Sequence, residues 1–179
     1  LTQIAKALSL SKATCTRAIN DLSASGLISQ TAEGTNKWIT TAYTKSELLE
    51  KAYGRLKTPV DRILYVKGTA QIEHPIASGI RALARQSMIG VNDQDGAIAI
   101  SKKEAAKIPA EDICTKQYFE DFGGAVIEVW SYDPIILERD GCVDDISLLL
   151  SMDNDPNERV QTCLDEIRQK HGLPIKEEE

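Results

Sequence analysis

The segment from Ser9 to Ile28, SLSKATCTRAINDLSASGLI, carries start and stop signals for one short helix. Ser11 is a favourable N-cap, because its hydroxyl can accept a hydrogen bond from the free amides of a first helical turn. Gly26 suits the left-handed position that follows a last turn. We therefore predict a helix that follows Ser11 and ends near Ser25.

The predicted helix has two different faces. Cys15, Ala18, Ile19 and Leu22 recur at helical spacing, so we expect them to be packed. The opposite face carries short or cationic side chains, namely Lys12, Ala13, Thr16, Arg17 and Asn20. No carboxylate occurs from Ser9 to Asn20, so this face suits phosphates and base edges.

Elements on both sides extend the pattern. The pattern predicts a short amphipathic helix over residues 2–8, and we expect a further helix before Leu1. Leu27–Gln30 and Lys37–Tyr43 predict two strands, and the polar segment Thr31–Asn36 between them predicts a turn. The order is that of a helix-turn-helix followed by a β-hairpin, which we call the wing.

The runs TQIAKALSLSKATCTRAINDLSASGLI and GTNKWITTAYTKSELLEKA resemble the winged-helix domain of MarR-type transcription regulators. The resemblance covers about the first 57 residues. It implies a DNA-binding domain whose second helix enters the major groove and whose wing touches the backbone or the minor groove. Where that family usually carries Asp-Arg-Arg in the wing, this chain has Thr35-Asn36-Lys37.

The resemblance and the polar face together predict the DNA contacts. Six residues are expected to face the major groove: Ser11, Lys12, Thr14, Thr16, Arg17 and Asn20. Asn36 and Lys37 are expected at the wing.

Charge is divided unevenly along the chain. Residues 1–67 hold ten Lys and Arg against five Asp and Glu, whereas residues 68–179 hold eleven against twenty-two. A polyanion is attracted to the first segment and repelled by the second. The overall net charge of −6 therefore does not exclude nucleic-acid binding by the first segment.

A capping-box pattern, Thr44-Lys45-Ser46-Glu47, predicts a linker helix that runs to Lys57 and ends at Thr58-Pro59. Its apolar stripe is Leu48, Leu49, Ala52, Tyr53 and Leu56. We therefore divide the chain into a winged helix, residues 1–57, and an accessory domain, residues 58–179.

The sequence of the accessory domain predicts an α+β fold with a small sheet. Strands are predicted at Arg62–Gly68, Gly96–Ser101 and Ala125–Tyr132, and a helix at Ala77–Ile89. A final helix is predicted with Asp155 as N-cap, Pro156 in its first turn and Gly172 after its end. Trp130 is expected in the core, with a place in a partner interface as the alternative.

No pattern for catalysis or metal binding stands out. The four cysteines and two histidines form no zinc spacing, and His74 precedes Pro75 in a predicted loop. An acidic set lacks the spacing of a calcium loop: Asp140, Asp144, Asp145, Asp153 and Asp155. We expect no metal, no cofactor and no enzymatic activity.

These features predict a cytoplasmic, prokaryotic transcription regulator that binds double-stranded DNA as a homodimer, with no membrane association. The accessory domain is expected to dimerise or to sense a small-molecule effector or protein partner. The alternative is an antitoxin-like or other protein-interaction module, whose winged helix autoregulates its operon or only mediates protein contacts.

Overall fold

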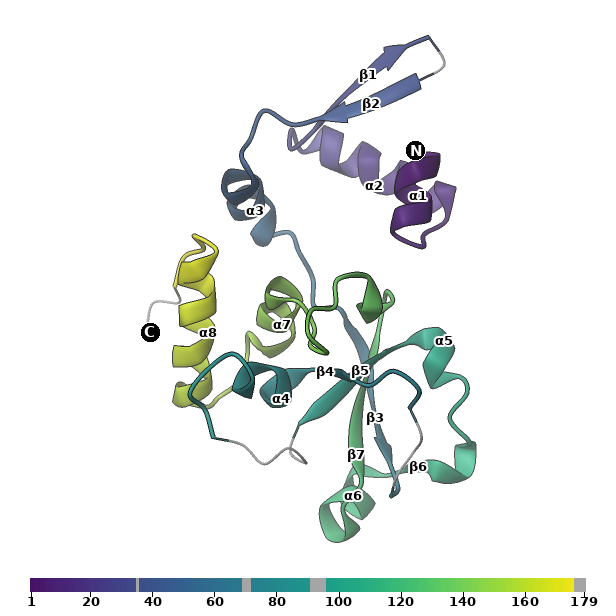
Figure 1. Cartoon of the computed structure of the whole chain (residues 1–179), viewed down its shortest axis with the longest axis vertical. Coiled ribbons are helices and arrows are strands. Elements are labelled where there is room, and N and C mark those ends of the chain that lie inside the picture. Colours follow the sequence, from purple (N-terminus) through teal and green to yellow (C-terminus); the bar gives the residue numbers. More distant parts are fainter. Residues whose placement is uncertain (35, 69–71, 91–95, 176–179) are drawn as a thin grey trace. The chain divides into compact units, whose positions relative to one another are not determined.

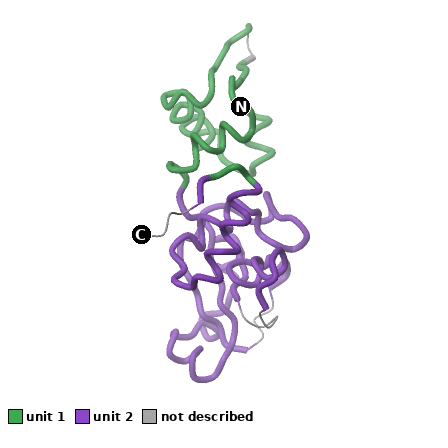
Figure 2. The backbone as a smooth tube through the Cα atoms, turned by 90° about the vertical axis from the view of Figure 1, so that its left-hand side faces the viewer, with its two compact units in different colours: residues 1–56, 171–173 green, residues 57–170, 174–179 purple. Residues whose placement is uncertain are grey.

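A computed structural model describes residues 1–34, 36–68, 72–90 and 96–175. The chain divides into two compact units (Figure 2). The first comprises Leu1–Leu56 with His171–Leu173, and the second comprises Lys57–Lys170 with Pro174–Glu179. Together they confirm the predicted α+β class, with one mixed sheet and one separate hairpin.

The first unit has the element order predicted for it (Figure 1). Helices α1 (Thr2–Ala7) and α2 (Lys12–Ala24) precede strands β1 (Ser29–Glu33) and β2 (Asn36–Thr40), and α3 (Lys45–Tyr53) follows. Ser9, in the turn between α1 and α2, has a left-handed backbone with φ 51°. Gly26, with φ 73°, follows α2 and confirms the predicted stop signal.

The wing and α3 differ from the prediction at their boundaries. The strands were predicted to end at Gln30 and restart at Lys37, but they pair up to Glu33 and Asn36, so the turn is much tighter. The exposed polar residues at the ends of the two strands also pair, because an antiparallel hairpin is held by backbone hydrogen bonds and does not require a buried face. The capping box of α3 is confirmed, yet α3 ends at Tyr53, with Gly54 as its C-cap, and not at Lys57.

The second unit is built on a five-stranded sheet of order β4-β5-β7-β3-β6. Its strands are β3 (Val60–Val66), β4 (Ile76–Ala77), β5 (Ala97–Ser101), β6 (Ile113–Cys114) and β7 (Ala125–Trp130). Its α-helices are α4 (Gly79–Ala84), α5 (Lys102–Ala105), α6 (Lys116–Phe122), α7 (Asp145–Met152) and α8 (Glu158–Lys170). Strands β5 and β7 are parallel, and the other pairs are antiparallel.

Alternation along the central strands divides the core between the two sheet faces. One face carries branched side chains, Ile100 of β5, Ile127 and Val129 of β7, and packs with Ala105 of α5. The other face carries Ala99, paired with Glu128. Helix α4 contacts β5 and packs with α7 and α8.

Glu128 is a carboxylate buried within this second face. Its Oε2 accepts hydrogen bonds from Ser78 Oγ at 2.6 Å and from Trp130 Nε1 at 3.0 Å. Trp130 is 1% exposed, which confirms that it belongs to the core. Because Ser78 immediately precedes α4, these bonds fix the start of that helix against β7.

Arg168 connects α8 to the end of α7. Its side chain is 1% exposed, and its guanidinium lies 2.6 Å from Asp165 and 2.7 Å from Asp153. Asp153 is the C-cap of α7, and Asp165 belongs to α8. The buried guanidinium is therefore paired with one carboxylate from each helix, at the junction between them.

Three sequence predictions in this unit need correction or extension. The helix predicted at Ala77–Ile89 is only Gly79–Ala84, because Ile76–Ala77 instead form strand β4. Asp155 is not the N-cap of α8: it accepts from the Asn157 amide, and the helix begins at Glu158. Gln161 donates to the carbonyls of Asp153 and Asp155, which holds that segment in a turn. Helix α7 was not predicted, since its apolar run resembles a buried strand as much as a helix.

No helix within the described ranges is long and apolar enough to cross a lipid bilayer. Over the same parts of the chain, no three His, Cys, Asp or Glu side chains gather in a group that could hold a metal ion.

Replacing Glu128 by alanine should lower the free energy of unfolding by about 2–4 kcal/mol, because two buried donors lose their acceptor. Glu128→Gln should lower the free energy of unfolding clearly less, since an amide oxygen can still accept hydrogen bonds from Ser78 and Trp130. Urea unfolding followed by circular dichroism measures both. Equal losses for the two variants would show that these hydrogen bonds contribute little.

Arg168→Ala should lower the free energy of unfolding by about 2–4 kcal/mol. This loss is smaller than that for a fully buried ion pair, because both carboxylates are partly exposed. Lys170→Ala, which removes an exposed ion pair with Asp145, is the matched control and should cost under about 1 kcal/mol. Thermal unfolding compares the two. A similar small loss for both would contradict the role given to Arg168.

Candidate nucleic-acid interface

The N-terminus of α2 is fixed by its first predicted contact residue. Ser11 has an extended backbone, and its Oγ accepts from the Thr14 amide at 3.0 Å, which confirms the predicted N-cap. The Ser11 and Thr14 hydroxyls also lie 2.8 Å apart. Both hydroxyls therefore take part in the cap, and Lys12 begins the helix beside them.

Burial determines which way α2 faces. Cys15 is 2% exposed and Ile19 is 9% exposed, so the packed side of the helix is narrow. The predicted packed set was too wide, because Ala18 and Leu22 are exposed. Helix α1 packs against α2, and the wing meets α2 at Ser23 and along the side of Ile19, so only one stripe of α2 is covered. Arg17 lies on the side opposite that stripe and is exposed.

A small hollow lies between α2 and the wing. It is lined by Thr16, Ile19 and Asn20 of α2, Gln30 of β1, Lys37 and Ile39 of β2, and Leu1. Its volume of about 60 Å³ is far below the roughly 300–1,000 Å³ of sites for drug-sized ligands. We call it the α2–wing hollow, and it joins polar side chains of helix and hairpin into one surface.

The wing is held against α2 by Gln30, whose Nε2 donates to Ser23 Oγ at 2.9 Å. Side chains alternate along β2, so Lys37 and Ile39 point toward α2 while Trp38 points away. The Lys37 ammonium is therefore on the same side of the hairpin as Thr16 and Asn20.

The electrostatics of α2 favour an anion. Its first turn holds no acidic residue, so the partial positive charge of the helix N-terminus is not offset there. Lys12, Arg17 and Lys37 are exposed. Asp21 lies one turn beyond Arg17 and marks where the cationic surface ends. Thr16 donates to the Lys12 carbonyl at 2.9 Å, which leaves its oxygen able to accept.

The structure brings only some of the predicted contact residues together. Thr16, Asn20 and Lys37 meet at the α2–wing hollow, whereas Arg17 lies on the adjoining outward face. The Asn36 side chain lies outside what the structure describes, although its backbone pairs with Glu33.

Two residues of the wing were not predicted from the sequence, one that lines this surface and one that does not. Gln30 lines the hollow, and Trp38 is 56% exposed on the other face of the wing. Trp38 could have been predicted from strand alternation. Lys37 and Trp38 are neighbours on one strand, so if Lys37 faces α2, Trp38 must point to the other face of the wing.

Neither a family model nor a curated protein nor a solved structure matches this chain.

Ser11→Ala should destabilise the first unit by about 1 kcal/mol, because the first turn of α2 loses its side-chain acceptor. Ser9→Gly is the companion variant: it removes a side chain from a left-handed position and should leave stability unchanged or raise it by up to about 1 kcal/mol. Thermal unfolding monitored by helix content tests both. A stabilised Ser11→Ala variant would contradict the observed cap.

Proposed function

We propose that the first unit binds double-stranded DNA and that the chain is a cytoplasmic, prokaryotic transcription regulator without enzymatic activity. One observation carries this proposal: α2 exposes Arg17, and its Thr16 and Asn20 meet Lys37 of the wing at one continuous surface. A helix and an adjoining hairpin that share polar and cationic side chains match the chemistry by which proteins read DNA grooves.

In this proposal α2 enters the major groove. An arginine guanidinium can bond the two acceptors of a guanine edge, and an asparagine amide can bond an adenine edge, so Arg17 and Asn20 are the base-reading candidates. Lys12 and Lys37 are the phosphate contacts, because an ammonium group acts as a point charge. The N-terminus of α2 adds free amide donors beside Lys12.

We further propose that the chain acts as a homodimer on a pseudo-palindromic site, with two copies of α2 about one DNA turn apart. Leu22 supports an association of two copies, since it is exposed on a flank of α2 away from the hollow. The second unit is then available for dimerisation or for sensing an effector.

A second candidate function is protein recognition by the first unit, as in an antitoxin-like module. The observation that favours it is a set of exposed large apolar side chains in one small unit: Leu1, Leu8, Leu10, Leu22 and Trp38. Exposed apolar side chains are a feature of protein-binding surfaces where they lie together. Trp38→Ala discriminates the two, because it should impair partner binding and leave DNA affinity within about twofold.

Fluorescence anisotropy with the upstream region of the protein's own gene and a scrambled duplex tests DNA binding. Arg17→Ala should weaken binding to the preferred duplex by about 1–3 kcal/mol and reduce its preference over the scrambled one. Lys37→Ala should weaken binding to both duplexes alike and lower the slope of log affinity against log salt by about 1.

Lys45→Ala is the matched control, because Lys45 is an exposed cation on α3 outside the hollow. It should change affinity less than either variant of the proposed interface. Absence of binding by the unmodified chain at low salt, or equal effects of all three substitutions, would reject the proposed interface.

A further inference from the structure

The second unit contains a groove of about 490 Å³ between the segment that follows α4 and the first turns of α8. Its volume falls within the roughly 300–1,000 Å³ of sites for small molecules. Its apolar wall is formed by Ile80, Met88 and Ile89, together with Gly90. The remaining residues of the lining come from α8 and the residue before it: Asn157, Arg159, Thr162 and Cys163. We call this site the α8 groove.

The apolar wall is held in place by Ser87. Its Oγ donates to the carbonyl of Leu83 at 2.8 Å and accepts from the amide of Ile89 at 3.4 Å. Leu83 is a core residue of α4, and α4 packs with α8. Met88, beside Ile89, is fully exposed. An alkyl chain in the groove would remove this apolar side chain from water, which is favourable, and the flexible thioether can adapt to it.

Arg159 gives the α8 groove its charge. Among the described residues that line the groove, it is the one charged side chain. Within the described parts of the chain, its guanidinium forms no ion pair and no hydrogen bond. Asn157 lies beside it, and its Oδ1 accepts from the Arg159 amide at 3.0 Å, which leaves its NH₂ group available to donate. A guanidinium and an amide donor are therefore offered to an anion.

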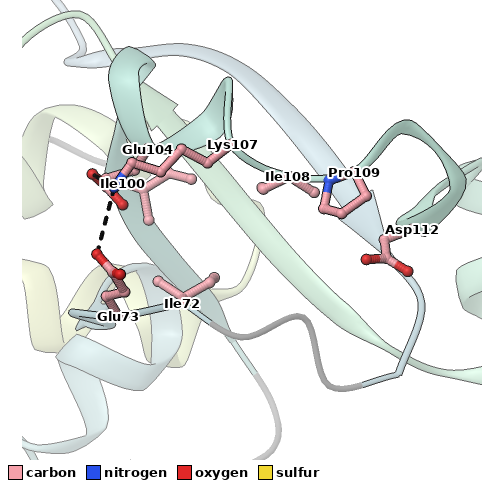
Figure 3. A pocket seen from close by; sticks show the side chains of 8 residues that line it. All are labelled: Ile72, Glu73, Ile100, Glu104, Lys107, Ile108, Pro109 and Asp112. Atoms are coloured by element: carbon pink, nitrogen blue, oxygen red, sulfur yellow. Dashed lines mark hydrogen bonds and ion pairs between the residues drawn. The ribbon is translucent and has the colours of Figure 1, made fainter.

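A cation without a carboxylate partner stands out in this acidic part of the chain. Residues 68–179 hold eleven Lys and Arg against twenty-two Asp and Glu. In a smaller cavity of the same unit, Lys107 already meets Glu104 at 2.8 Å and Glu73 at 3.4 Å (Figure 3). No described carboxylate occupies Arg159 in this way, so an anion from solution can pair with it.

We propose that the α8 groove binds a medium-chain aliphatic monocarboxylate, with its carboxylate at Arg159 and Asn157 and its alkyl chain along the apolar wall. Only the carboxylate is anchored, so the ligand need not span a fixed distance. A cation with the same tail is repelled by Arg159, and a small anion leaves the apolar wall in water. The site lies outside the proposed DNA interface, and its argument does not depend on DNA binding.

Isothermal titration calorimetry of the full chain with octanoate, in the absence of DNA, tests the site. Octanoate should bind saturably with one site per chain and a Kd of about 0.1–1 mM. Butyrate, which keeps the carboxylate and shortens the tail, and octylamine, which keeps the tail and reverses the charge, should each bind about tenfold or more weakly. Equal binding of octanoate and either comparison ligand, or no saturable binding of octanoate at 5 mM, roughly five times the weakest expected Kd, would overturn the proposal.

Variants of the two walls locate the bound octanoate. Arg159→Gln removes the charge, and Met88→Asp places a carboxylate in the apolar wall, so each should weaken octanoate binding by about tenfold. Both side chains are exposed, so neither replacement disturbs the core.

Arg139→Gln is the matched control, since Arg139 is an exposed arginine of the same unit that does not line the groove. It should leave the octanoate affinity within about twofold. An equal loss for Arg139→Gln and Arg159→Gln would show diffuse attraction of the anion to positive charge and contradict the site. Unchanged binding in both the Arg159 and the Met88 variants would place octanoate elsewhere and contradict it as well.

Discussion

Burial of Cys15 and Ile19 fixes the orientation of α2, and the proposed interface depends on that orientation. The two residues lie one turn apart, so together they define a single buried line along the helix. Arg17 is then directed outward, and Thr16 and Asn20 are directed toward the wing. A different packed line on the same helix would turn Arg17 inward and separate Asn20 from Lys37. The Ser11 cap and the bond between Gln30 and Ser23 keep the helix and the hairpin in that arrangement.

The second unit relies on buried polar groups as well as on apolar packing. Glu128 ties β7 to the start of α4, and Arg168 ties α8 to the end of α7. Each group is satisfied by short hydrogen bonds, which offset the cost of its desolvation. These contacts organise α4, α7 and α8, while the apolar cluster of Ile100, Ile127 and Val129 lies on the other sheet face. The polar network and the apolar cluster therefore use separate sets of side chains.

Features with strong local chemistry were predictable from the sequence. Ser11, Gly26 and the Thr44–Glu47 capping box each have one favourable geometry, and the structure places all three as expected. Strands β5 and β7 were also predicted closely, because β-branched runs with clear ends have few alternatives. The α+β class follows from these elements.

Features set by distant partners were not predictable. Ala18 and Leu22 have helical spacing suited to a core, but burial depends on which elements cover them, and none does so within the described part of the first unit. The Glu128 network joins residues 50 apart in the sequence, and no local pattern records that pairing. A cavity lined by Ile100 likewise combines the segment of Glu73 with that of Asp112, and only the folded chain brings these segments to one cavity. At the candidate interface, the exposed polar face of α2 was predictable, whereas the position of Lys37 at the same hollow as Thr16 and Asn20 depends on how the wing folds back.

The most direct test of the DNA interface is a nuclear magnetic resonance titration of the isotopically labelled chain with an unlabelled duplex from its own upstream region. If α2 and the wing bind DNA, the largest amide shifts should occur within residues 11–20 and at Lys37, and they should diminish as salt is added. Shifts confined to the second unit, or centred on Trp38 and the exposed leucines and insensitive to salt, would contradict it.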